Sequence, residues 1–290
     1  MKYIPHKYQQ LAERHIYQTP RCGLFLEMGL GKTVVTLTAI NNLIYDSFEI
    51  SKALVIAPLR VAEDTWSRES EKWDHLKHLR ISKILGTPKQ RRKAIAADAD
   101  IYIVNRENVV WLCNELSQIG DGWDFDAVII DELSSFKSPK AQRFKALRKY
   151  ITRSSRVIGL TGTPAPNGLI DLWSQIYLLD GGERLGKTVT GFRERYFVPN
   201  QRNQTTIFNY KPKPEAEENI NEKISDICIS MKADDWLEMP ERIDSIQTVK
   251  LSEKEMAAYE KFEKDAYLQF LEGEVTATSA AALTGKLLQY

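Results

Sequence analysis

The 290-residue chain has few of the residues that bind metals or form disulfides. Its three cysteines, Cys22, Cys113 and Cys228, lie far apart and show neither metal-ligand nor disulfide spacing. His75 and His78 form an i, i+3 pair, but no third ligand lies near them in the sequence, so a surface helix is the better interpretation. These absences argue against a disulfide scaffold and give no support for a metal centre built from cysteine or histidine.

The chain also lacks a long apolar run and a large net charge. No hydrophobic stretch approaches the ~20 residues of a membrane span, and the first residues form no apolar signal segment. We therefore expect a soluble, intracellular protein that is not secreted and does not bind a membrane. The formal net charge is +1, so no overall basic field indicates a nucleic-acid partner.

Two stretches are nevertheless basic and free of acidic residues. Residues 137–156 include eight Lys or Arg, and residues 79–97 include six. For each stretch, a solvated helix face and an anion-binding face both stay open.

Short apolar runs alternate with stretches of helical length through the first part of the chain. The predicted strands are brief and apolar on both faces, as buried parallel strands are. They are Cys22–Leu26, Ala53–Ala57, Ile101–Val104, Ala127–Ile130 and Val157–Leu160. The predicted helices are Thr33–Tyr45, Val61–Trp73, Pro88–Ala97 and Lys140–Tyr150. This alternation predicts a doubly wound α/β fold with a mostly parallel sheet, in which ligands bind beyond the carboxyl ends of the strands.

From about Gly181 glycine, proline and polar residues replace this alternation. The sequence then predicts four elements: a helix at Glu217–Ile227, a strand at Ser245–Leu251, a helix from Ser252 to about Leu271, and a helical tail at Thr276–Tyr290. We therefore expect two parts, an α/β lobe at residues 1–180 and a C-terminal helical extension at residues 181–290.

A phosphate-binding loop is the most informative motif. The apolar run that ends at Leu26 leads into Glu27-Met28-Gly29-Leu30-Gly31-Lys32-Thr33. Two glycines allow a tight turn whose N–H groups face an anion, and the start of the following helix attracts phosphate. Lys32 would bind the β- and γ-phosphates, and the Thr33 hydroxyl would bind Mg²⁺. The longer form of this motif has glycine where Leu26 stands, which favours the shorter loop of helicase-like ATPases over a nucleotide kinase.

An acidic pair follows another predicted strand about a hundred residues later. Asp131 could hold Mg²⁺ through its water shell, and Glu132 could orient and deprotonate an attacking water. Weaker signals are Thr161-Gly162-Thr163 after the strand ending at Leu160, and Gln9, whose amide could contact an adenine edge. Together these residues predict ATP and Mg²⁺ as ligands.

The motifs, in their order and spacing, resemble helicase superfamily two and, within it, the Swi/Snf-like DNA-dependent ATPases. The matching blocks are Tyr8-Gln9, residues 27–33, Ala57-Pro58-Leu59 with Trp66, Asp131-Glu132 with Phe136-Lys137-Ser138, residues 160–167 and Leu172-Trp173. A weaker match follows at Met239-Pro240, residues 249–252 and Tyr259.

The resemblance implies a RecA-like ATP-binding lobe with a helical protrusion. It implies that Gln9 contacts adenine, that Lys32 and Thr33 bind the triphosphate and Mg²⁺, and that Asp131 and Glu132 serve hydrolysis. Thr161, Gly162 and Thr163 would couple the ATP state to double-stranded DNA. The family positions that touch the nucleic-acid backbone are Pro58, Leu59, Arg60, Asn105 and Arg106.

Two departures from the family pattern affect what we expect. Ser134 stands where many relatives have histidine in the acidic motif. The second RecA-like lobe, which supplies transition-state arginines in this family, has no counterpart in these 290 residues. We therefore expect that the chain hydrolyses almost no ATP by itself. We also expect it to be a monomer.

Other functions fit the same motifs. A strand-separating helicase or a restriction-type motor subunit shares the ATP-binding motifs. A largely non-catalytic module that binds ATP and DNA, and a phosphate-loop switch with a protein partner, are the alternatives of a different class.

Overall fold

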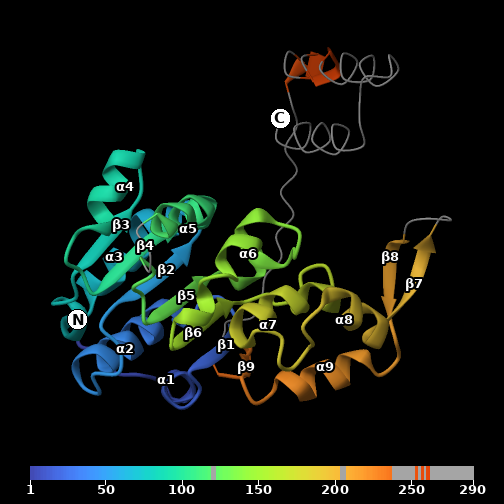
Figure 1. The fold of residues 1–290 in the computed structure, drawn as a ribbon, viewed down its shortest axis with the longest axis horizontal. Coiled ribbons are helices and arrows are strands. Elements are labelled where there is room, and N and C mark those ends of the chain that lie inside the picture. Colours follow the sequence, from blue (N-terminus) through green and yellow to red (C-terminus); the bar gives the residue numbers. More distant parts are fainter. Residues whose placement is uncertain (119–121, 203–206, 237–251, 254–255, 258, 262–290) are drawn as a thin grey trace. The chain divides into compact units, whose positions relative to one another are not determined.

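A computed structural model describes residues 1–118, 122–202, 207–236, 252–253, 256–257 and 259–261 (Figure 1). Contacts between Cα atoms divide the chain into two compact units, Met1–Met239 and Pro240–Tyr290. The strand expected at Ser245–Leu251 and the tail expected at Thr276–Tyr290 lie outside the described residues, as does most of the helix expected from Ser252. The two-part division predicted at residue 180 stays a prediction.

Within the described residues, seven parallel strands form one sheet in the order β3-β4-β2-β5-β6-β1-β9. The strands are β1 (Arg21–Leu26), β2 (Ala53–Ala57), β3 (Ile81–Ile84), β4 (Ile101–Asn105), β5 (Ala127–Asp131), β6 (Arg156–Thr161) and β9 (Cys228–Met231). The five strands predicted from sequence are confirmed to within about one residue at each end. The edge strands β3 and β9 were not predicted, because each has only four residues and carries polar side chains.

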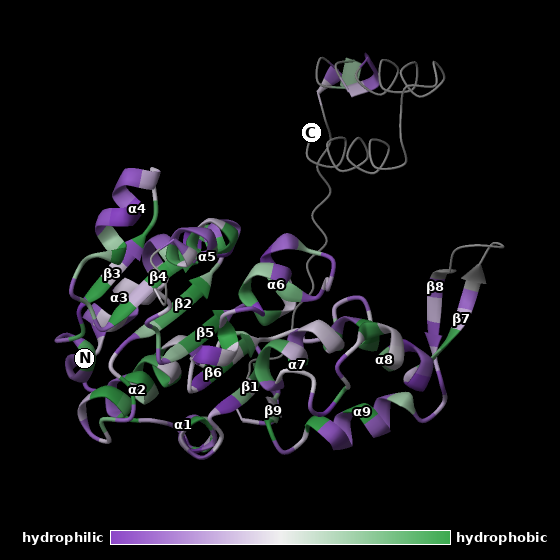
Figure 2. Cartoon of the chain, in the orientation of Figure 1, coloured by the Kyte–Doolittle hydropathy of each residue, from purple (hydrophilic) through white to green (hydrophobic). Residues whose placement is uncertain are grey.

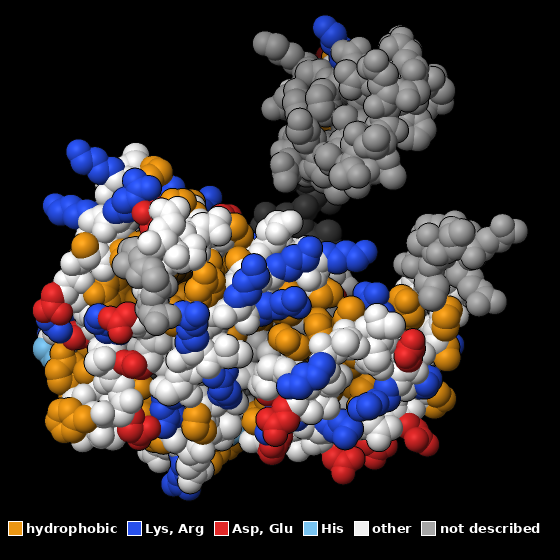
Figure 3. Space-filling view, in the orientation of Figure 1, with side chains coloured by type: hydrophobic (Ala, Val, Ile, Leu, Met, Phe, Trp, Pro, Cys, Tyr) orange, Lys and Arg blue, Asp and Glu red, His pale blue; other side chains and the backbone are white. Residues whose placement is uncertain are grey.

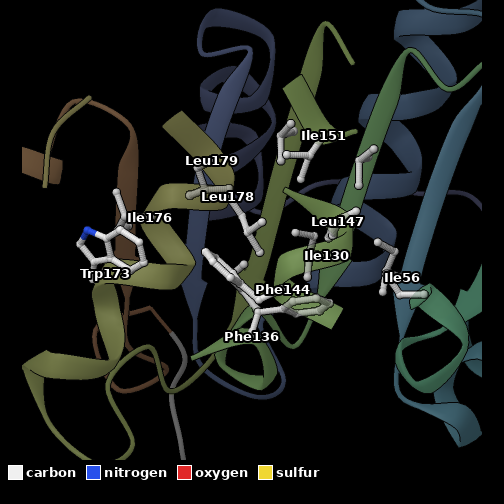
Figure 4. Packing of buried hydrophobic residues seen from close by; sticks show 14 of the residues in the cluster. Ile56, Ile130, Phe136, Phe144, Leu147, Ile151, Trp173, Ile176, Leu178 and Leu179 are labelled. Carbon is white, nitrogen blue, oxygen red and sulfur yellow. The ribbon is translucent and has the colours of Figure 1, made fainter. Parts of the chain in front are cut away.

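The strands alternate their side chains between two separate hydrophobic cores. Val55 and Ile129 face one core, while Ile56 and Ile130 face the other. Helices α1 (Lys7–Gln18), α2 (Lys32–Tyr45) and α3 (Trp66–Lys72) cover the first core. The second core is covered by α5 (Val109–Ser117), α6 (Gln142–Leu147), α7 (Leu172–Asp180), α8 (Val189–Tyr196) and α9 (Ala216–Ile224), and Figure 4 shows part of it. This arrangement confirms a doubly wound α/β sheet of RecA-like type.

Two helices depart from the predictions, and the helix expected at Pro88–Ala97 is confirmed to within about two residues. Helix α2 is buried on nearly every side, so its apolar residues do not form the single stripe expected from Val34, Leu37, Ile40 and Ile44. The helix expected at Val61–Trp73 starts with a π-helical turn at Val61–Thr65 and continues as α3. Helix α4 (Pro88–Ile95) has no buried residue, and it is largely hydrophilic in Figure 2.

The described residues after 180 form further helices and a hairpin, and then add a strand to the main sheet. After α8 comes an antiparallel hairpin of β7 (Phe197–Arg202) and β8 (Ile207–Pro212), and then α9. The chain next returns to the main sheet, where β9 pairs with β1. Among the described residues, no helix is long and apolar enough to span a membrane.

Gly159 in the middle of β6 tests the packing between the sheet and the acidic turn. A Cβ at this position would lie 2.5 Å from Leu133 Cδ2 and 3.2 Å from Leu179 Cδ2. We expect Gly159→Ala to lower the free energy of unfolding by about 1–3 kcal/mol, because an added methyl overpacks a closed core. Urea denaturation measures this change.

Leu133→Ala supplies the control for this prediction. The double variant should lose less stability than the sum of the two single variants, because the truncated side chain makes room for the new methyl. Strict additivity would show that the cost arises from the backbone and not from this contact.

Candidate functional site

The predicted chemical residues meet at one edge of the sheet. Strands β5, β6 and β1 are neighbours and parallel, so their carboxyl ends lie side by side. Asp131 ends β5, Thr161 ends β6, and the loop of residues 27–31 follows β1. Lys32 lies close enough to both Asp131 and Glu132 for their charges to influence its pKa. The lysine and the acidic pair therefore face the same site.

The loop of residues 27–31, predicted to bind phosphate, contains two glycines with left-handed backbone. Gly29 has φ 86° and Gly31 has φ 72°, and Gly31 is the residue that precedes α2. The Lys32 ammonium donates to the carbonyl oxygens of Leu26 at 2.7 Å and Glu27 at 3.2 Å. Burial lowers the pKa of Lys32, while the two nearby carboxylates raise it. The cation is thus held inside the loop that precedes its own helix.

Trp66 on α3 fixes the carboxylate of Asp131. The indole is fully buried, and its Nε1–H donates to Asp131 Oδ2 at 2.9 Å. Burial raises the pKa of Asp131 above its ordinary value of 3.8, and the charge of Glu132 also raises it. The Trp66 hydrogen bond and the Lys32 charge oppose this rise. Sequence reasoning matched Trp66 to a family block but missed this contact, since 65 residues separate the pair.

Glu132 adopts a backbone conformation that is unusual for a residue other than glycine. Its φ is 57°, and its Oε1 accepts hydrogen bonds from Thr161 Oγ1 at 2.9 Å and from the Ser134 hydroxyl. The Thr163 N–H donates in turn to Thr161 Oγ1 at 3.1 Å. The residue in the fourth position of the acidic motif therefore contacts the second residue directly. These bonds connect the acidic turn to the T-G-T segment.

Gly162 and Gln9 complete the surroundings of the loop. A Cβ on Gly162 would lie 3.3 Å from Leu26 O and 3.8 Å from Lys32 Nζ, so this glycine lies against the loop. Gln9 is only 6% exposed, and its Oε1 accepts from the His6 N–H at 2.9 Å. Its Nε2 is 2.7 Å from the place where a Cβ on Gly31 would stand. The structure thus brings both predicted residues to the phosphate-binding loop.

Glu27 makes a long-range contact that sequence reasoning missed. Its Oε2 accepts from the Ala233 N–H at 2.8 Å, and its own N–H donates to Met231 O at 3.1 Å. Trp236 in the same segment lies 5.9 Å from Tyr8, between ring centroids. The first residue of the loop is therefore tied to the chain that leaves β9, and no local signal could have revealed this because about 200 residues intervene.

The residues expected at the nucleic-acid backbone follow the adjacent strands β2 and β4. Arg60 is exposed and Pro58 is half-buried. Asn105 is only 5% exposed, with its amide bonded to Glu107 and Asn108, and Arg106 Nε pairs with Glu107 at 2.8 Å. Asn105 is therefore buried and hydrogen-bonded to residues of its own loop, whereas Arg60 faces solvent.

The two histidines of the i, i+3 pair contact other side chains. The His75 ring is hydrogen-bonded to Thr38 Oγ1 at 2.9 Å and stacked on Tyr3, and His78 packs edge-on against Tyr45. No group of three His, Cys, Asp or Glu side chains that could hold a metal occurs among the described residues. Any cation at the site would be held by few protein ligands, together with water and phosphate oxygens, which is how Mg²⁺ is ordinarily bound.

The SNF2-related domain matches residues 8–289, almost the whole chain. The chain belongs to the SNF2-related domain family. Protein p41 of Acyrthosiphon pisum secondary endosymbiont phage 1 is 39% identical over 99% of the chain and 63% of its own length. The RAD54-like DNA repair and recombination protein of Gallus gallus is 26% identical over 94% of the chain and 39% of its own length. This SNF2-related chain thus spans less than two thirds of both relatives.

The fold also matches a solved structure. The Sulfolobus solfataricus SWI2/SNF2 ATPase core, solved in complex with dsDNA, superposes with a TM-score of 0.66 over the whole chain and 57% of its own length. Its sequence is 23% identical. At this identity the likeness establishes the fold.

The raised pKa of Asp131 predicts a stability cost at neutral pH. A carboxyl whose pKa is higher in the folded state binds its proton more tightly there, so stability falls as pH rises from the unfolded value towards the folded one. Asp131→Asn removes the ionisable group and keeps an acceptor for Trp66. We expect a higher melting temperature at pH 7.5 and a smaller gain as pH falls towards 4, measured by differential scanning fluorimetry.

Asp126→Asn is the matched control, because it makes the same change with the opposite expected sign. Burial raises the pKa of Asp126, but bonds from Ser51 and Lys52 outweigh burial and leave that pKa below its ordinary value. This variant should lose about 1 kcal/mol of stability at pH 7.5. Destabilisation by both substitutions would contradict the account of Asp131.

Proposed function

We propose that this chain is the ATP-binding lobe of a Swi/Snf-like DNA translocase, which couples ATP hydrolysis to movement on double-stranded DNA. The observation that carries the proposal is that Lys32, after β1, lies close to Asp131 and Glu132 at the end of β5, with β6 between the two strands. Membership of the SNF2-related domain family supports the same conclusion. No observation favours a strand-separating helicase or a restriction-type motor subunit over this function.

In this proposal the loop of residues 27–33 binds the triphosphate. Lys32 exchanges its two carbonyl partners for phosphate oxygens, which form stronger charge-assisted bonds. N–H groups of Met28, Gly29, Leu30 and Gly31 and the start of α2 face the same anion. Gln9, buried beside Gly31, reads the adenine edge with its amide.

The donor set at the site fits Mg²⁺. The Thr33 hydroxyl and the Asp131 carboxylate are hard oxygen ligands, and the rest of an octahedral shell would come from water and phosphate. When bound, the ion neutralises charge that develops on the phosphates. Asp131, held by Trp66, keeps its oxygens oriented, and Glu132 positions the attacking water and accepts its proton.

Coupling to DNA would run through the T-G-T segment. Because Thr161 donates to Glu132 and Thr163 donates to Thr161, a change in the acidic turn alters the hydrogen bonding of residues 161–163. Pro58, Arg60, Asn105 and Arg106 belong to the proposed nucleic-acid side of the lobe. Residues 181–290 would form the protrusion that leads to a second RecA-like lobe, and the chain would act as a monomer.

Two substitutions separate nucleotide binding from hydrolysis. Lys32→Ala removes a charge-assisted contact and should weaken the binding of a fluorescent ATP analogue by about 10–100-fold. Glu132→Gln should leave binding within a few-fold but slow hydrolysis, in the DNA-stimulated protein with its second lobe, by about 10²–10⁴-fold. Lys89→Ala on exposed helix α4 serves as the control. Normal hydrolysis by the Glu132 variant would refute the role of that residue.

The 290-residue chain alone should hydrolyse ATP at a negligible rate. Transition-state arginines in this class of ATPase contribute about 10³–10⁵-fold, and the proposal places them on the second lobe. Phosphate release by the isolated chain, with and without duplex DNA, measures the rate. Brisk turnover that Lys32→Ala abolishes would show that the site is complete without a second lobe.

A further inference from the structure

The two acid-free basic stretches look alike in sequence but differ in the structure. In residues 79–97 most of the charge is engaged. Arg80 pairs with Asp98 and Asp100, and Arg92 pairs with Glu115. Arg91 lies over the Trp111 ring at 4.5 Å and donates to Gly86 O, while Lys83 donates to Glu63 O. Only Lys89 and Lys93 of this stretch are exposed without a recorded partner in the described part of the chain.

In residues 137–156 the ion pairs lie towards the two ends of the stretch. In its middle, Arg143 lies over the Phe136 ring at 5.8 Å and Arg148 over the Phe144 ring at 6.0 Å. Lys137 lies 4.0 Å from Asp171, and Arg156 pairs with Glu49. Four cations between them are exposed and form no ion pair with any described residue: Lys140, Lys145, Arg148 and Lys149. We call these four residues the α6 basic face, since Lys145 lies in α6 and the other three lie just before or after it. In Figure 3 blue side chains gather over the region of α6.

Helix α6 packs its apolar residues into the core, so the charged residues in and beside it are left exposed to solvent. Phe144 and Leu147 are fully buried in the core, and Phe144 lies 6.0 Å from Trp173 and 5.8 Å from Tyr177, between ring centroids. The helix is therefore fixed to α7 by its apolar side. Within the part of the chain that the structure describes, no acid forms an ion pair with any of the four cations, so their mutual repulsion is a cost that is not relieved there.

A groove of about 460 Å³ continues this face beside Lys140. Its walls include Lys140, Asn167, Arg193, Asn209 and Tyr210. Arg193 lies over the Tyr210 ring at 5.1 Å, and its buried Nε–H has no hydrogen-bond acceptor among the residues that the structure describes. The guanidinium of Arg193 in the wall of this groove favours an anion there, and a phosphate group can accept charge-assisted hydrogen bonds from it.

We propose that the α6 basic face and the adjoining groove bind the sugar-phosphate backbone of double-stranded DNA, in addition to the backbone positions after β2 and β4. The proposal rests on the proposed function, because it assigns a second contact to the same DNA. Four exposed cations without an ion pair to any described acid suit a polyanion such as a phosphate backbone, and such contacts are independent of base sequence. An acidic protein surface would match less well, because its charges are irregular.

Lys145→Glu/Lys149→Glu tests the α6 basic face, and Lys89→Glu/Lys93→Glu is its matched control. Both pairs are exposed lysines spaced i, i+4, and both double variants change the net charge by the same amount. Binding of a 20-base-pair duplex to the 290-residue chain is measured by fluorescence anisotropy between about 50 and 200 mM salt. The α6 variant should bind the duplex about 10-fold or more weakly than wild type. The slope of log affinity against log salt concentration should decrease by the amount expected for the loss of about two phosphate contacts. The control should stay within about 2-fold of wild type.

The outcomes separate this proposal from the proposed function. If wild type binds nucleotide and duplex, and both double variants bind the duplex equally, the α6 basic face is refuted and the proposed function stands. Failure of wild type to bind a fluorescent ATP analogue would refute the proposed function itself. Nucleotide binding without any duplex binding would refute the assignment of the face to DNA. Equal displacement of the duplex by polyglutamate at the same charge concentration would overturn that assignment in favour of an acidic protein.

Discussion

The charge arrangement around Lys32 is the interaction on which the rest of the site depends. One ammonium lies inside a glycine loop, bonded to two carbonyl oxygens, and faces two carboxylates from a neighbouring segment. Burial makes each of these charges costly alone, and it strengthens their attraction to one another. The glycines at 29, 31 and 162 follow from this arrangement. Two of them permit left-handed backbone, and the third keeps a side chain away from the lysine. The site is thus charged, partly desolvated and already ordered around the place where phosphate would lie.

The acidic turn and the end of β6 form one connected unit. Glu132 holds a left-handed backbone that costs of order 1–2 kcal/mol for a residue with a Cβ. Bonds from Thr161 and Ser134 offset this cost and aim the carboxylate across the sheet edge. Gly159 lets Leu133 pack directly against β6 just below this point. A shift of Glu132 would therefore disturb residues 161–163 without any movement of the sheet itself.

Sequence reasoning succeeded where the signal is local. The five inner strands are apolar on both faces because both faces are covered, and the loop at residues 27–33 and the pair Asp131-Glu132 follow directly from strand ends. Strands β3 and β9 were not predicted, because their formation depends on pairing with the strand beside them and not on their own four residues. The contact of Trp66 with Asp131 and the ion pairs that neutralise residues 79–97 arise from tertiary structure. No local sequence pattern predicts them. The same limit explains why two basic stretches of equal appearance have different surroundings.

The position of β9 ties the loop of residues 27–33 to the chain that leaves the sheet. Strand β9 pairs with β1 in register, and Glu27 then holds the backbone of both Met231 and Ala233. Each of these hydrogen bonds contributes about 0.5–1.5 kcal/mol, so moving Glu27 without the exit segment would break two of them at once. Trp236 against Tyr8 adds an aromatic contact to the helix that carries Gln9. The residues that follow β9 are consequently joined to both ends of the proposed nucleotide site, to the side of Gln9 through Tyr8 and to the loop of residues 27–33 through Glu27.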